Sequence, residues 1–188
     1  MKVSLQWLSD YMALPPTDEP AKKLTFAGLE VEAIERPPAG VVVGQILESN
    51  KHPQADKLSV TKVDFGRGPT QIVCGAKNYK VGDKVPVATV GTRLPNGTEI
   101  REAELRGVKS SGMLCSAREL GLSEDHQGLM ILPTDAKPGV TLDELVGITF
   151  EVNVTPNRPD ALCHLGIARE VATLTAAAMK SPAKPVAE

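Results

Sequence analysis

Residues 58–74 read LSVTKVDFGRGPTQIVC, and this stretch decides the fold. Two short runs rich in β-branched residues, 58–65 and 70–74, flank a Gly-Arg-Gly turn signal. Similar short runs lie at 41–47, 84–90, 113–115 and 129–132. The run 58–65 does not alternate cleanly, as expected where a barrel strand bends and changes faces. Strands this short and this regular predict an OB-like five-stranded barrel rather than a parallel α/β sheet.

The two chain ends have a different pattern from the middle. Residues 2–5 predict a strand and 6–12 a helix with Trp7, Leu8 and Tyr11 on one side, followed by a helix over 18–27 and an edge strand near Val31. Near the other end, 150–154 alternates as a strand. A helix follows, with an apolar stripe at Ile167, Val171, Leu174 and Ala178.

Both ends carry apolar faces that must be buried, so we expect one small α/β domain made from the two of them, with the barrel inserted between. The fold class is therefore mainly β with an α+β part. The predicted segments are 1–39 and 150–180 for the split α/β domain, 40–149 for the OB-fold domain, and 181–188 as a linker. Short helical turns are predicted at 117–120 and 142–146.

Composition excludes several classes of protein. With 188 residues, of which 41% are hydrophobic, the chain is not a disordered one. No window approaches the ~20 apolar residues of a membrane span, and the N-terminus lacks a secretory apolar core, so we expect a cytoplasmic protein without a membrane partner. The three cysteines are dispersed, which argues against a disulfide framework and against a zinc site. Cys163 and His164 are adjacent and would point about 100° apart on a helix, which is not a catalytic geometry.

Charge is distributed unevenly along the chain. The formal net charge is −2, but residues 51–118 hold 12 Lys and Arg against 6 Asp and Glu, a net of +6. Acidic segments lie on both sides of this basic middle. Such a middle could contact a phosphate backbone. The alternative is an ordinary solvated surface of mixed charge.

Three stretches of the barrel combine cations with Gly, Ser or Asn, namely 50–58 (NKHPQADKL), 72–78 (IVCGAKN) and 105–116 (LRGVKSSGMLCS). Glycine lets a backbone approach a phosphate, and Lys and Arg supply charge. No P-loop or dinucleotide glycine spacing is present, so we exclude NTP hydrolysis. Phe65 and Tyr79 are the only aromatic residues in this part, which is too few for stacking successive bases. The remaining hypothesis is a domain that recognises the shape of a folded RNA through its sugars and phosphates.

These residues also have structural alternatives. We expect His52 to be exposed before Pro53, although it could instead be a turn residue that packs on that proline. Lys57, Arg106 and Lys109 could be solvated charges. The cluster 110–113 could be a purely structural turn.

The three stretches resemble the EMAP-II-type tRNA-binding OB domain, with 106–116 as the most specific part. The flanking motifs MKVSLQWL (1–8), GLEVE (28–32) and PNRPD (156–160) followed by GIARE (166–170) resemble the start of the bacterial phenylalanyl-tRNA synthetase beta subunit. The resemblance covers nearly the whole chain. By this resemblance, the candidate tRNA contacts are Lys51, His52, Lys57, Lys77, Asn78, Arg93, Arg106, Lys109, Ser110, Ser111, Met113 and Ser116.

The resemblance implies an α2β2 ligase that joins phenylalanine to tRNA with ATP and Mg²⁺. Its aminoacylation site belongs to the alpha subunit, so this segment is expected to carry no catalytic site, no cofactor and no metal. The expected partners are tRNA, the alpha subunit and the remaining beta-subunit domains. Two alternatives stay open: an architectural or subunit-interaction module, and a free-standing structure-specific tRNA-binding protein.

Overall fold

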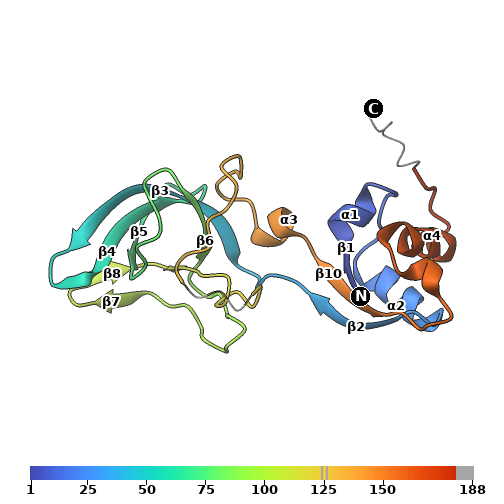
Figure 1. Ribbon diagram of the computed structural model, residues 1–188. Helices are drawn as coiled ribbons and strands as arrows, with labels where there is room; N and C mark the ends of the chain where they lie inside the picture. The colour runs from blue at the N-terminus through green and yellow to red at the C-terminus, as the bar shows by residue number, and fades with distance from the viewer. Residues whose placement is uncertain (124, 126, 181–188) are drawn as a thin grey trace. The chain divides into compact units, whose positions relative to one another are not determined.

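The computed structural model describes residues 1–123, 125 and 127–180. They form two compact units. The terminal unit consists of residues 1–36 and 147–180, and the central unit of residues 37–146. Figure 1 shows that the terminal unit combines elements from both ends of the chain, coloured blue and orange to red. The domain limits expected from the sequence, 1–39, 40–149 and 150–180, remain a prediction.

The terminal unit has one small antiparallel sheet and several helices. The sheet has the order β1-β10-β2, with β1 at Lys2–Ser4, β10 at Thr149–Asn153 and β2 at Glu30–Glu35. The helical elements are α1 (Leu5–Ser9), α2 (Asp18–Phe26), the 3-10 turn η1 (Pro159–Ala161) and α4 (His164–Thr175).

The core of the terminal unit joins residues far apart in the sequence. Val3 pairs in register with Phe150, and both are fully buried. Ile167 and Val171 of α4 are buried in the same core, as the apolar stripe predicts. Ala178 is not on this helix, because α4 ends at Thr175 and Ala176 adopts a left-handed conformation. Burial of apolar faces from both chain ends stabilises this unit.

The first helix is shorter than predicted. It spans Leu5–Ser9 instead of 6–12, and the Ser4 side chain caps it by accepting from the Trp7 backbone N–H. Leu5 and Leu8, three residues apart, are its buried residues. Trp7 does not share their side, since 53% of its surface is exposed. At 100° per residue, a helix of this length buries only one narrow stripe.

The central unit contains a five-stranded antiparallel sheet of order β5-β4-β3-β6-β9. Its core is aliphatic, and it confirms the mainly β, OB-like prediction. The strands are β3 (Val41–His52), β4 (Ala55–Asp64), β5 (Pro69–Cys74), β6 (Lys84–Ala88) and β9 (Met113–Leu114), and the helix α3 (Leu142–Val146) follows near the end of the unit.

Several predicted elements of the central unit differ from those observed. β3 extends to His52, five residues beyond its predicted end. Residues 129–132 form no strand and make only an isolated bridge from Leu132 to Lys84. Residues 117–120 form a turn, as predicted. A two-stranded ribbon, β7 (Ala103–Leu105) with β8 (Val108–Ser110), was not predicted, because each strand has only three residues and β7 is exposed throughout.

Gly44 fixes the packing of β3 against its neighbours. A Cβ atom at this position would overlap a methyl group of Val87 and lie 2.7 Å from a methyl group of Val63. Both valines are fully buried. The side chains of β4 and β6 can therefore meet over β3 only because residue 44 has no side chain.

Candidate RNA-binding surface

Two hairpin tips of the central unit are joined at His52. The β3–β4 hairpin turns after His52, and the β7–β8 hairpin turns at Arg106 and Gly107. The Nε2 atom of His52 lies 2.9 Å from the carbonyl oxygen of Leu105, and the backbone N–H of Gln54 donates to Nδ1 at 3.1 Å. Nδ1 is therefore an acceptor, so Nε2 carries the proton and donates to Leu105. The expectation that His52 is exposed is wrong: only 4% of its surface is accessible.

Arg106 lies at this junction. Its φ of 49° is left-handed, as the tight turn before Gly107 requires. Its Nη1 atom donates to the carbonyl oxygen of Gln54 at 3.4 Å. Lys51 and Lys57 are exposed on the β3–β4 hairpin. The structure therefore brings Lys51, Lys57 and Arg106 to two hairpin tips that touch, although they are up to 55 positions apart in the sequence.

A second cation approaches the same hairpin from another segment. Lys51 lies opposite Ser59 in the register of β3 and β4. The Nζ atom of Lys77, in the segment after β5, donates to the Oγ atom of Ser59 at 3.2 Å. Lys77 therefore contacts the strand residue that pairs with Lys51 in the sheet.

A cavity of about 590 Å³ opens beside the end of β5, and we call it the β5 cavity. Three predicted site residues, Lys77, Met113 and Ser116, line it. The Glu119 carboxylate also lines it, and its Oε2 atom accepts from the Ser116 backbone N–H at 2.6 Å and from the Ser116 hydroxyl at 2.8 Å. In the sequence, Glu119 begins an acidic stretch that favours the architectural alternative, and it was not selected as a site residue.

The thiols near this cavity are not nucleophiles. Burial, followed by the nearby Glu119 charge, raises the pKa of Cys115 to about 12. Burial also raises the pKa of Cys74, which lines the cavity. Both residues therefore remain protonated at neutral pH.

Other predicted contacts serve the fold. The Asn78 amide donates to the Leu129 carbonyl oxygen and accepts from the Leu129 N–H, both at 2.9 Å, which fixes one wall of the β5 cavity. The Ser110 hydroxyl, 4% exposed, accepts from the Val73 N–H at 3.1 Å and so ties β8 to β5. Ser111 donates to a Glu102 carboxylate oxygen at 3.3 Å. These contacts favour the structural alternative for the 110–113 turn.

Two predicted cations, Arg93 and Lys109, lie neither at the junction of the two hairpin tips nor in the lining of the β5 cavity. Arg93 lies in the loop after β6, where its backbone forms an isolated antiparallel β-bridge with Glu99. Lys109 is exposed on β8, opposite Glu104. A second cavity, of about 420 Å³, lies near β8 and is lined by Ser110 and Met113 but by neither of these two cations.

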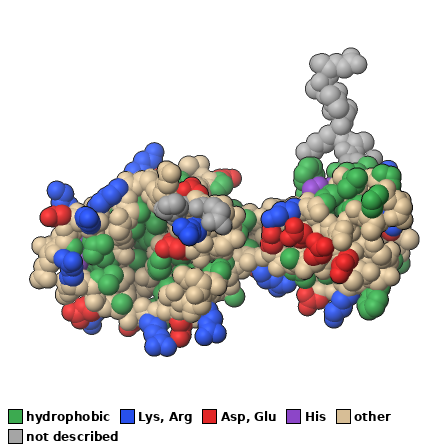
Figure 2. All heavy atoms as spheres, turned by 60° about the horizontal axis from the view of Figure 1, so that its bottom comes forward, with side chains coloured by type: hydrophobic (Ala, Val, Ile, Leu, Met, Phe, Trp, Pro, Cys, Tyr) green, Lys and Arg blue, Asp and Glu red, His purple; other side chains and the backbone are tan. Residues whose placement is uncertain are grey.

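The predicted cations lie on several elements of the central unit: Lys51, Lys57 and Arg106 at the two hairpin tips, Lys77 after β5, Arg93 after β6 and Lys109 on β8. In Figure 2, the Lys and Arg side chains on the visible face of the central unit stand at several separated places. Within the described part of the chain, none of the six predicted cations has a carboxylate within 4.0 Å. Lys62, by contrast, is paired with Glu48 at 3.0 Å. The predicted cations therefore keep their charge available for a phosphate.

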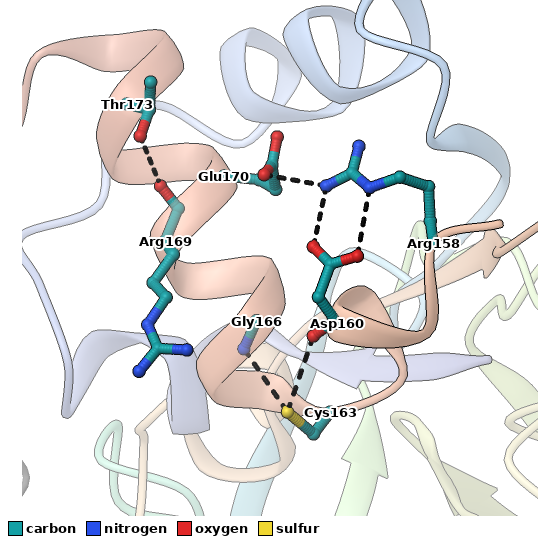
Figure 3. Close-up of polar contacts among 7 residues, drawn as sticks. All are labelled: Arg158, Asp160, Cys163, Gly166, Arg169, Glu170 and Thr173. Carbon is teal, nitrogen blue, oxygen red and sulfur yellow. Dashed lines mark hydrogen bonds and ion pairs between the residues drawn. The ribbon is translucent and has the colours of Figure 1, made fainter.

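The terminal unit holds an ion-pair cluster that sequence reasoning missed. Figure 3 shows the Arg158 guanidinium between the carboxylates of Asp160 and Glu170, at 2.9 and 2.8 Å. Hydrogen bonding to Arg158 holds the pKa of Asp160 below its ordinary value. The PNRPD and GIARE motifs are thus connected through their charged residues. The sequence feature that could have indicated this cluster is the presence of Arg158 and Asp160 in the first motif and Glu170 in the second.

Cys163 and His164 do not act as a nucleophile and its base. The Cys163 sulfur accepts from the Gly166 N–H at 3.4 Å and so caps α4 (Figure 3). His164 stacks on Trp7 with ring centroids 4.0 Å apart, and its Nε2 atom accepts from the Ser4 N–H at 3.1 Å. Burial lowers the pKa of His164.

Two further searches cover the described residues only. No group of three or more His, Cys, Asp or Glu side chains there is placed to hold a metal ion. None of the helices in the described ranges is both long and apolar enough to cross a membrane.

Comparison with known proteins identifies relatives of the whole chain. The phenylalanine–tRNA ligase beta subunit of Anaeromyxobacter dehalogenans is 58% identical over 97% of this chain. The corresponding subunits of Syntrophotalea carbinolica and Fusobacterium nucleatum are 43% and 45% identical over 100% of it. The chain covers 24%, 24% and 25% of these three relatives, so it spans about a quarter of their length.

A family model described as a putative tRNA binding domain matches residues 41–141. These residues include both hairpin tips, the β5 cavity and every predicted site residue. The match covers more than half of the chain and nearly all of the central unit. The chain therefore belongs to the putative tRNA binding domain family, and along its whole length it is similar to a part of the phenylalanine–tRNA ligase beta subunit.

Proposed function

We propose that the central unit binds folded tRNA by its sugar-phosphate backbone. The observation that carries this proposal is the junction of the two hairpin tips, where Lys51, Lys57 and Arg106 are exposed within the segment matched by the tRNA-binding family. Cations without competing carboxylates attract phosphates and release counterions. Lys77, which donates to Ser59 on the strand β4 beside Lys51, extends this surface toward the β5 cavity.

The surface is suited to the shape of a folded RNA more than to a single strand. Phe65 and Tyr79 are partly buried against the core, so the described central unit offers no row of exposed aromatic rings on which successive bases could stack. The Tyr79 hydroxyl is also within hydrogen-bonding distance of Ser49, at 3.1 Å. Recognition of a folded RNA relies on phosphate and 2′-hydroxyl contacts along its contour.

We further propose that the chain is the N-terminal part of a phenylalanine–tRNA ligase beta subunit that works in the cytoplasm with an alpha subunit. The support is the similarity of 43–58% identity along the chain. In this proposal, the ligation of phenylalanine with ATP and Mg²⁺ takes place outside this segment. The terminal unit serves as a scaffold in this proposal. Its fold is stabilised by the ion pairs of Arg158 and by a core that contains residues from both ends of the chain.

One observation favours the architectural alternative for the terminal unit. Trp7, Phe26 and Leu162 are 53%, 90% and 59% exposed, although they are large apolar side chains. Large exposed apolar groups are typical of surfaces that meet other protein parts. In the architectural alternative, the barrel packs mainly against other synthetase domains and its RNA contact is incidental; the three exposed side chains lie on the terminal unit, so they support a protein-contacting role for that unit.

Titration of folded tRNA into the 188-residue chain at several salt concentrations tests the tRNA proposal. Affinity should fall as salt rises, and replacing Lys51 and Arg106 by Ala should lower the slope of log affinity against log salt by about 1 for each phosphate that is no longer neutralised. Lys62→Ala is the matched control, since Lys62 is exposed but already paired with Glu48. Binding that is insensitive to salt, or an equal effect of Lys62→Ala, would contradict the proposal.

A further inference from the structure

The β5 cavity has features that a phosphate surface does not need. Its volume of about 590 Å³ lies within the range of small-molecule sites. Met113, Leu114 and Leu129 give it apolar walls, and Lys77 and Glu119 contribute opposite charges. A phosphate site would exclude the carboxylate, so the cavity suits a ligand that has both hydrogen-bond donors and an anionic group.

Glu119 is oriented by the backbone around it. Its Oε2 atom accepts two hydrogen bonds from Ser116, and only 8% of the Ser116 surface is accessible. In the part of the chain that is described, Oε1 has no hydrogen-bond partner. A fixed carboxylate with one oxygen still available is an acceptor whose position does not need to be ordered on binding.

We propose that the β5 cavity binds one unstacked guanine nucleotide, whose N1–H and N2–H groups donate to Glu119 while its phosphate contacts Lys77. Guanine presents two adjacent donors, N1–H and N2–H, on its Watson–Crick edge; because Oε2 already accepts twice from Ser116, both donors would point to the free Oε1 oxygen of Glu119. Uracil presents one donor between two acceptors, which the carboxylate would repel. The base lies between Met113 and Leu129, where a flexible thioether adapts to a flat ring.

This proposal rests on the proposed function, because the nucleotide is one that the bound tRNA supplies from a loop. Bases in RNA loops can leave the stack and be recognised on their Watson–Crick edges. Lys77 connects the two surfaces: its Nζ atom contacts Ser59 of the β3–β4 hairpin, and its side chain lines the cavity. A backbone held at the hairpin tips could therefore place a neighbouring base in the cavity.

The first experiment titrates GMP, AMP, CMP and UMP into the 188-residue chain at low salt and follows the Met113 and Leu129 methyl signals by NMR. We expect GMP to shift both signals and UMP to bind at least about tenfold more weakly, since hydrogen bonds to a charged group contribute strongly to affinity. Equal binding of the four nucleotides, or no shift at either methyl group, overturns the proposal.

Two variants test the roles of the charged residues. Glu119→Gln should abolish the preference for GMP over UMP, and Glu104→Gln, an exposed acid on β7, is the matched control and should preserve it. Lys77→Ala should weaken GMP binding and leave guanosine binding unchanged, because guanosine lacks the phosphate. Since Lys77 is exposed, this variant tests the site even where Glu119→Gln disturbs the fold.

Failure of the site and failure of the tRNA proposal are distinguishable. If tRNA binds in a salt-dependent manner but GMP does not shift the cavity signals, the guanine site alone is wrong. If GMP binds with the expected preference but tRNA does not bind, the site takes a free guanine nucleotide, and the tRNA source is wrong. A tRNA affinity that Glu119→Gln leaves unchanged also contradicts the RNA source.

Discussion

His52 and Leu105, 53 positions apart, join two hairpins of the central unit through a hydrogen bond of 2.9 Å between Nε2 and the Leu105 carbonyl oxygen. Because Gln54 donates to Nδ1, the imidazole is held in one neutral tautomer. The ring is buried between cationic tips. It is therefore a positioning residue for Lys51, Lys57 and Arg106 and offers no free edge to RNA.

Replacing His52 by Phe should keep the bulk and remove the hydrogen bonds to the Leu105 carbonyl and from the Gln54 N–H. We expect a loss of about 0.5–1.5 kcal/mol in the free energy of unfolding for each bond, because Gln54 and Leu105 are exposed and water replaces part of what is lost. Urea unfolding measures this. tRNA affinity should also fall under native conditions. An unchanged stability would show that the ring acts only by packing, and Lys62→Ala, an exposed lysine paired with Glu48, serves as the control.

Gly44→Ala should destabilise the central unit. The added methyl group would overlap the buried side chains of Val87 and Val63, and overpacking of this kind costs about 1–3 kcal/mol. Gly75→Ala is the control, since the nearest atom to its Cβ would be 3.6 Å away. Comparison of the two unfolding curves checks this, and equal stability of the two variants would refute the packing argument.

Protonation of His164 should destabilise the terminal unit. Burial lowers its pKa in the folded state, so the unfolded chain binds the proton first. Stability should therefore fall as pH drops below the ordinary His value of about 6.5, until the lower folded pKa is passed. His164→Phe keeps a ring against Trp7 but cannot titrate. The stability difference between wild type and this variant should shrink between pH 7 and pH 5, as followed by the fluorescence of Trp7, the single tryptophan.

Thiol reactivity should separate Cys163 from the other cysteines. Cys163 is exposed, while Cys74 and Cys115 are buried and have raised pKa values. With an aromatic disulfide reagent at pH 8, one thiol should react rapidly in the native chain and three after denaturation. Cys163→Ser should remove the fast reaction. Two fast thiols in the native protein would mean that the cavity wall opens.

Some of the site could be predicted from the sequence because its signals are local. The basic segment, the glycines and serines of 105–116 and the absence of spare aromatic residues are properties of neighbouring positions. The sequence motifs could not reveal which hydrogen-bond partners their polar side chains have in the folded protein. Asn78 and Ser110 were expected to contact RNA, yet their hydrogen bonds to Leu129 and Val73 are internal. A polar side chain has the same identity whether it faces a ligand or a backbone amide.

By itself, the sequence determined the mainly β class, the aliphatic core of the central unit and the uneven distribution of charge, since turn residues and apolar runs act over a few positions. Tertiary structure alone decided which cations meet, that His52 is buried, and that Glu119 shares a cavity with Lys77. These depend on the register of strands and on loops that return from distant parts of the chain. Such contacts are fixed by burial and hydrogen bonding of the whole chain, which no local pattern records.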